Sequence, residues 1–179
     1  SNYFFATTIT CANDEARAMY VEAYGHMLNY NHEQAIACFT QCAELDPTCA
    51  MAYWGIAYCL SSSYNWAPGL GSGYDSIQLA LANKDGCTEL EIDLIDALSL
   101  RHTKEARDQM DPTVLNMGNT PELNAAFATA MKPIYEKYAG NLDVASIYVE
   151  ALMNLNPWQL WEKNTTTGEI TPIDDNTLL

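Results

Sequence analysis

The chain has 179 residues, 49% of them apolar, a length that allows one ordinary domain or one run of repeats around a sizeable core. Its 23 acidic and 8 basic residues give a formal net charge of −15, which argues against binding to nucleic acids and to anionic membrane surfaces. No apolar run approaches the roughly 18 residues of a membrane span. The chain opens at Ser1 without a signal peptide, so we expect a processed mature form or a fragment.

Residues 1–12 are predicted to form an extended N-terminal arm. Tyr3, Phe4 and Phe5 stand among several threonines, and aromatic and β-branched side chains favour extended backbone. Apolar side chains at a terminus need to be covered. The arm therefore either packs on the first helix of its own chain or docks onto another copy.

Residues 13–158 are predicted to form a helical domain. Asn13 or Asp14 caps its first helix, because a short polar side chain can accept a hydrogen bond from the first turn. Pro47 is expected to begin the third helix, where Gly55 lets a neighbouring helix approach closely. The predicted helices span about 14–29, 32–45, 47–62, 74–83, 88–101, 120–138 and 143–155, with a short helical turn near 104–110.

Three features mark the later part of the chain. Residues 61–73 are rich in Ser, Gly and aromatics and are expected to form an inserted loop. Thr88 and Glu91 form a predicted capping box, and Pro133 predicts a kink or break in the sixth helix. Residues 159–179 are expected to be an irregular polar tail. The prediction is thus an all-α fold of about seven helices.

A 34-residue period runs through the first half of the chain. Ala57 follows Ala23 by 34 residues (57 − 23), and Trp54 follows Tyr20 by the same number (54 − 20). That period, with Ala, Phe and Pro at set offsets, is typical of tetratricopeptide repeats. The segment DPTCAMAYWGIA at 46–57 and the segment EALMNLNPWQLW at 150–161 resemble two blocks of a tetratricopeptide-repeat family. The resemblance implies a short helical-repeat solenoid and names no reaction. The His-rich repeats that follow in that family are not present in this sequence.

The resemblance also implies a partner-binding groove. In tetratricopeptide repeats, set positions of each first helix line the concave face. An apolar groove of aromatic and Met side chains suits a peptide or a segment of another chain. These side chains can instead pack against the insertion at 64–70, which would fill the groove internally. The residues that map to the groove are Arg17, Tyr20, Tyr24, Met27, Met51, Trp54 and Tyr58.

The six cysteines allow disulfides or a purely structural role. Cys11 and Cys49 each precede the first helix of a repeat, so they are the best candidates for a disulfide. Cys38 and Cys42 lie four residues apart, but no second Cys or His pair completes a zinc site, so we expect no metal. Asn164 begins an N-glycosylation sequon. Together the cysteines and the sequon favour a secreted protein, and a cytoplasmic location is the alternative.

No catalytic motif is recognisable. The histidines at 26, 32 and 102 form no metal-ligand spacing, and the Gly-rich segment at 69–73 lacks the strand and Lys of a phosphate loop. The acidic pairs Glu89/Glu91 and Asp93/Asp96 are expected on the solvated face of the fifth helix. We therefore predict no cofactor and no enzymatic activity.

The leading hypothesis is a protein-interaction scaffold that assembles with copies of itself. The arm offers Tyr3, Phe4 and Phe5 at one end, and an uncapped last helix offers Trp158 and Trp161 at the other. Contacts between such different ends produce filaments unless they close into a ring. Two alternatives stay open: the amino-terminal part of a larger enzyme or metal-binding protein, and an intracellular peptide-binding adaptor.

Overall fold

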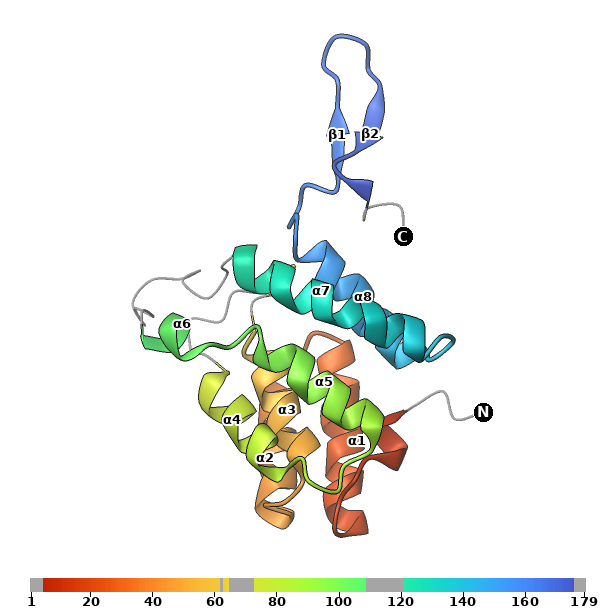
Figure 1. The fold of residues 1–179 in the computed structure, drawn as a ribbon. Coiled ribbons are helices and arrows are strands. Elements are labelled where there is room, and N and C mark those ends of the chain that lie inside the picture. The colour runs from red at the N-terminus through yellow and green to blue at the C-terminus, as the bar shows by residue number, and fades with distance from the viewer. Residues whose placement is uncertain (1–4, 62, 65–72, 109–120, 176–179) are drawn as a thin grey trace.

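The computed structural model describes residues 5–61, 63, 64, 73–108 and 121–175 (Figure 1). Within these residues the fold is all-α, as predicted, with eight α-helices, one 3₁₀ turn and one two-stranded sheet. None of these helices combines the length and apolarity that crossing a membrane requires. The helices are α1 (Asp14–Leu28), α2 (His32–Leu45), α3 (Ala50–Cys59), α4 (Tyr74–Asn83), α5 (Glu89–Ser99), α6 (Lys104–Asp108), α7 (Pro121–Lys137) and α8 (Leu142–Met153).

Local capping signals place several helix ends where the sequence predicts them. The Asn13 side chain accepts a hydrogen bond from the Ala16 N–H at 2.8 Å, which caps α1. Thr88 and Glu91 form both bonds of the predicted capping box at the start of α5. These motifs depend only on residues within one turn, so they are visible in sequence.

The predicted helix start at Pro47 and the predicted break at Pro133 are wrong, while a kink at Pro133 stays a prediction. Pro47 does not begin α3, because the Asp46 carboxylate accepts hydrogen bonds from the Thr48 N–H and hydroxyl and holds a turn before Ala50. Pro133 does not break α7, which continues to Lys137. Buried side chains lie on both sides of that proline, Met131 before it and Ile134 after it, so packing supports the helix through the missing hydrogen bond.

Neighbouring helices pack in chain order around one core. The pairs α1–α2, α2–α3, α3–α4, α4–α5, α5–α7 and α7–α8 are in contact, and α3 also contacts α1 and α5 (Figure 1). This order agrees with stacked helix pairs, while the tetratricopeptide assignment stays a prediction. Trp54, Tyr20, Tyr24 and Phe39 are the largest fully buried side chains. The close approach predicted at Gly55 is confirmed, since a Cβ there would lie 2.5 Å from the Phe39 ring.

The N-terminal segment is docked on its own chain. Residues Phe5–Thr8 form a 3₁₀ turn, η1, so the predicted extended arm is wrong there. Ala6 and Ile9 are buried, which pulls the backbone onto the helices. Thr10 donates from its N–H and its hydroxyl to the Glu91 carboxylate, at 2.6 and 2.7 Å. Tyr3 and Phe4 lie outside the described residues, and so does the Phe5 side chain.

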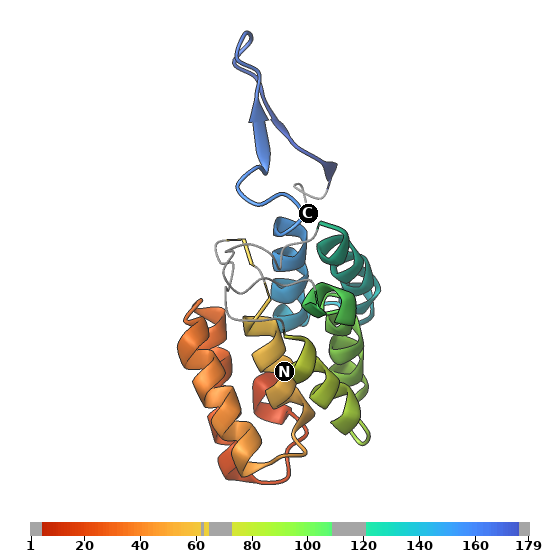
Figure 2. The ribbon, with the colours of Figure 1, turned by 90° about the vertical axis from the view of Figure 1, so that its left-hand side faces the viewer.

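The C-terminal segment forms a hairpin where an irregular tail was predicted. Strands β1 (Trp161–Lys163) and β2 (Ile170–Pro172) pair antiparallel, with Glu162 opposite Thr171. The Gly168 N–H donates to the Asn164 carbonyl, and Gly168 has a φ of +75°, which glycine adopts without strain. Both views show the hairpin standing clear of the helices (Figures 1 and 2).

Candidate functional site

The predicted partner-binding groove is closed in the folded chain. Tyr20, Tyr24, Met51 and Trp54 are fully buried, so they cannot line an open surface. The prediction of an accessible groove at these positions is therefore wrong. Arg17 is partly exposed, but its guanidinium is bound to Asp14 and to the Cys11 carbonyl.

Helices α5 and α8 fill that groove. The Tyr24 hydroxyl donates to the Asp143 carboxylate at 3.1 Å, and the Tyr58 hydroxyl donates to Glu150 at 2.7 Å. The Trp54 Nε1–H donates to the Leu94 carbonyl on α5 at 3.1 Å. The hydroxyl or N–H group of each of these three aromatic side chains thus has a hydrogen-bond acceptor within the chain. The alternative of an internally filled groove is therefore the correct one, but helices fill the groove. Of the insertion at 64–70, which was expected to fill it, only Tyr64 is among the described residues.

Burial changes the acid–base properties of the α8 contacts. Burial raises the pKa of Glu150, and the hydrogen bond from Tyr58 and the charge of Arg101 partly offset that rise. Burial also raises the pKa of Tyr58, and the neighbouring Glu150 charge adds to it. Tyr24 has a raised pKa for the same two reasons, with Asp143 as the charge. The contacts are those of a buried polar network that fastens α8 in place.

An open hollow remains beside α8. It has a volume of about 540 Å³ and lies where the end of α1 and Tyr30 face α8. Of the predicted groove residues, Met27 and Tyr58 reach its wall. Four of its lining residues are large apolar side chains exposed to solvent, with Leu142 at 58% exposure. We call this the α1–α8 hollow; it is lined by Met27, Leu28, Tyr30, Tyr58, Leu142, Ala145, Ser146, Ile147, Val149, Glu150 and Met153.

The hairpin carries the second group of exposed apolar side chains. Trp161 is 54% exposed and Ile170 is 62% exposed, and every residue of β1 faces solvent. Trp158 stacks on Tyr64 with ring centroids 5.1 Å apart, yet it is 73% exposed. Of the two predicted assembly ends, the one at Trp158 and Trp161 is thus displayed on the surface. Its helix α8, however, is not uncapped, because it packs on α7 and bonds to Tyr24 and Tyr58.

Asn164 lies in the turn of the hairpin. Its side chain is exposed, and its Oδ1 accepts hydrogen bonds from the Thr166 and Thr167 N–H groups at 2.9 and 3.0 Å. The sequon therefore occupies a projecting surface turn, where a glycan meets no steric obstacle from the helices. Glycosylation of Asn164 stays a prediction.

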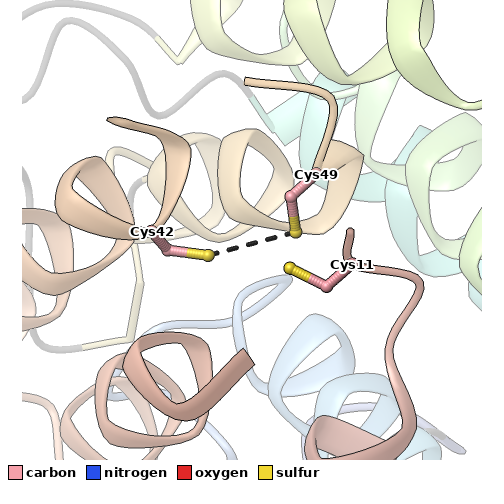
Figure 3. Close-up of side chains that lie close together, drawn as sticks. All are labelled: Cys11, Cys42 and Cys49. Atoms are coloured by element: carbon pink, nitrogen blue, oxygen red, sulfur yellow. Dashed lines mark hydrogen bonds between the residues drawn. The ribbon is translucent and has the colours of Figure 1, made fainter. Parts of the chain in front are cut away.

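The cysteines are free thiols in this structure, and three of them converge. The Sγ atoms of Cys11, Cys42 and Cys49 all lie within 4.8 Å of one another (Figure 3). The predicted disulfide pair, Cys11 and Cys49, is thus brought together without being bonded. Cys42 joins it because the end of α2 lies beside the start of α3.

The acidic residues of α5 are engaged rather than simply solvated. Glu91 is buried and accepts hydrogen bonds from Thr10 and Thr88, so its predicted place on the solvated face is wrong. Glu89 and Asp93 both pair with Lys137 of α7 at 2.7 Å. Glu91 is buried because Thr10 of the N-terminal segment binds it, whereas Glu89 and Asp96 are exposed, as predicted.

One polar pair is missed by the sequence patterns. The Ser61 hydroxyl lies 2.8 Å from His102 Nε2 and 3.0 Å from the Ala57 carbonyl. Burial and the Arg101 charge lower the pKa of His102 to about 3, so the ring is neutral at physiological pH. Both residues are buried, and the contact ties the end of α5 to the end of α3. The two residues are 41 positions apart in sequence, so no local signal links them.

Comparison with protein families, with curated proteins and with solved structures finds no match to this chain. Two surfaces of the molecule therefore carry the information on function: the α1–α8 hollow and the hairpin.

Proposed function

We propose that the chain is a non-enzymatic helical scaffold that binds further copies of itself, with the hairpin of one copy docked in the α1–α8 hollow of the next. The observation that carries the proposal is the distribution of exposed apolar side chains. Among the described residues there are twelve large ones; Leu28, Tyr30, Leu142 and Val149 line the hollow, and Trp158, Trp161, Ile170 and Ile173 belong to the hairpin segment. Exposed apolar groups that gather in this way mark interaction sites.

The hairpin needs a partner for a physical reason. A two-stranded hairpin is marginally stable in water by itself, and its outer edges carry unpaired backbone groups. In this chain it stands clear of the helices, so its apolar side chains gain no cover from its own core (Figures 1 and 2). An apolar hollow on a second copy supplies that cover.

The two surfaces differ, so the contact is heterologous. Such contacts extend into a filament unless the rotation between copies closes a ring. The negative charge opposes association, since each copy carries a formal net charge of −15. An extracellular location is part of the proposal, supported by the exposed sequon at Asn164. The intact mass of the native protein tests that part.

Sedimentation velocity over a range of concentrations, with negative-stain imaging, tests the assembly. Leu142→Asp places a charge in the hollow, and Leu79→Asp places the same charge at a comparably exposed position on α4. We expect assembly of the wild type and of Leu79→Asp, and loss of assembly in Leu142→Asp. A wild type that stays monomeric at tens of micromolar contradicts the proposal, as does equal behaviour of the two variants.

A further inference from the structure

Three thiols from separate parts of the chain point to one place. Cys11 precedes α1, Cys42 lies in the last turn of α2, and Cys49 is the residue before α3. The Cys42 and Cys49 sulfur atoms are 4.0 Å apart, and all three sulfur atoms lie within 4.8 Å of one another (Figure 3). Cys42 and Cys49 are fully buried, while Cys11 is half-buried. The cluster is therefore held by the core and is reached from the side of Cys11.

A buried hydroxyl near these thiols has no partner. Tyr20 is fully buried, and within the described residues its Oη makes no hydrogen bond. Burial raises the pKa of Tyr20, and the charges that Tyr24, Cys49, Glu91 and Cys42 would carry raise it further. A buried donor left without an acceptor is destabilising. The Tyr20 hydroxyl is thus a polar group buried in the same region of the core as the thiols.

Two of the three thiols hold their protons strongly without a cation. Burial raises the pKa of Cys11 to about 12, and the hydrogen bond with Cys42 together with burial raises the pKa of Cys49. Thiolates are strong ligands for soft metal ions, and such an ion displaces the thiol protons when it binds. The Asp46 carboxylate accepts hydrogen bonds from Ala12 and Thr48 and also raises the pKa of Cys11, but it does not belong to the convergent group. The donor set is three sulfurs.

We propose that Cys11, Cys42 and Cys49 bind one soft metal ion of the Cu(I) class through their three sulfur atoms. Soft thiolate ligands select Cu(I), whereas structural Zn²⁺ sites almost always take four ligands. Each S–H bond that is replaced by a metal–sulfur bond releases one proton, and the ion stays Cu(I) throughout. The guanidinium of Arg17 donates to the Cys11 carbonyl at 3.1 Å, which helps to hold the backbone of Cys11 in place. The site shares no residue with the α1–α8 hollow or the hairpin, so the test of metal binding is independent of the test of assembly.

The test is Cu(I) binding by the reduced protein under anaerobic conditions. Competition with a chromogenic Cu(I) chelator gives the affinity, and native mass spectrometry gives the stoichiometry. We expect one Cu(I) per chain, bound more than about 100-fold more weakly by Cys11→Ala, since even second-shell changes weaken metal sites by 10–100-fold. Cys11→Ala is the mildest of the three changes because Cys11 precedes α1 and is half-buried.

Three further variants serve as controls for the Cu(I)-binding test. Cys59→Ala removes an equally buried thiol at the opposite end of α3 and should bind Cu(I) like the wild type. Tyr20→Phe removes a hydroxyl that makes no hydrogen bond to the sulfur atoms and should bind Cu(I) like the wild type. Cys38→Ala tests the other convergent group among the described residues, Glu22, His26 and Cys38 on the surface of α1 and α2, and should leave Cu(I) binding unchanged.

Four results would overturn the assignment. They are absence of Cu(I) binding, equal loss in Cys59→Ala and Cys11→Ala, a binding loss confined to Cys38→Ala, and tighter binding of Zn²⁺ than of Cu(I) at the cluster. A Cys11–Cys49 disulfide, located by peptide mapping of the native protein under non-reducing conditions, would also overturn it, since it removes two of the three ligands.

Discussion

The two faces of α8 behave in opposite ways. One face packs beside α1 and α3, where Asp143 binds the Tyr24 hydroxyl and Glu150 binds the Tyr58 hydroxyl at the inner wall of the hollow. The other face leaves Leu142 and Val149 in contact with solvent at the α1–α8 hollow. The difference shows that the same helix completes the core and supplies an unsatisfied apolar surface. Stability should depend on the first face and association on the second.

The largest effect on stability is expected at Trp54, and Trp161 is the exposed control. Trp54→Ala removes a fully buried ring and its bond to Leu94, and should lower the free energy of unfolding by about 3–5 kcal/mol. Trp161→Ala changes an exposed side chain and should shift the free energy of unfolding by less than about 0.5 kcal/mol. Denaturant unfolding at concentrations where the protein is monomeric measures both. Similar losses in the two variants would remove the distinction between the two regions.

Acid should weaken the core through His102. The unfolded chain binds a proton at this ring below about pH 6.5, while the folded chain does so only below about pH 3. Because the unfolded state takes up more protons in that interval, stability is lost as the pH falls from 6.5 toward 3. His102→Gln should flatten this part of the pH profile, as followed by denaturant unfolding at each pH. An unchanged slope in the variant would show that other groups cause the acid sensitivity.

Two glycines test how tightly the core is packed. Gly55→Ala would place a Cβ 2.5 Å from the Phe39 ring and should destabilise the fold by about 1–3 kcal/mol. Gly25→Ala on α1 meets no atom within 4 Å and should stabilise it by about 0.5–1 kcal/mol, since Ala favours helix more than Gly. Thermal unfolding measures both. Opposite signs support the packing described here, and two equal shifts would contradict it.

Salt should act on association and hardly on the core. With a formal net charge of −15 on each copy, screening between about 20 and 300 mM salt should lower the concentration at which copies associate. Sedimentation at the two salt concentrations measures the change. Weaker association at high salt would indicate that ion pairs, rather than apolar contacts, hold the copies together.

Local signals account for the parts of the fold that the sequence predicts. Asn13, Thr88 and Glu91 act within a single helical turn, so the starts of α1 and α5 are readable directly. The filling of the groove cannot be read from local sequence, because Tyr24 and Asp143, which form one of its contacts, are 119 positions apart. The hairpin was missed since its strands have three residues each, although the Thr-rich turn that ends in Gly168 was a usable signal.

The thiol cluster is predicted in part. The sequence places Cys11 and Cys49 at equivalent positions before two helices, and the structure brings them together. Cys42 is fully buried on α2. Its sulfur reaches the pair only because the turn at Asp46 reverses the chain between α2 and α3. A spacing rule along one helix carries no information about that reversal.

A mixing experiment tests the central claim most directly. Leu142→Asp alters the hollow but keeps the hairpin, and Trp161→Asp alters the hairpin but keeps the hollow. Each variant alone should sediment as a monomer. Mixed in equal amounts, the two should form one-to-one dimers and nothing larger, because only one intact hairpin and one intact hollow can meet. A mixture that sediments as separate monomers, or assembly by either variant alone, would contradict the account.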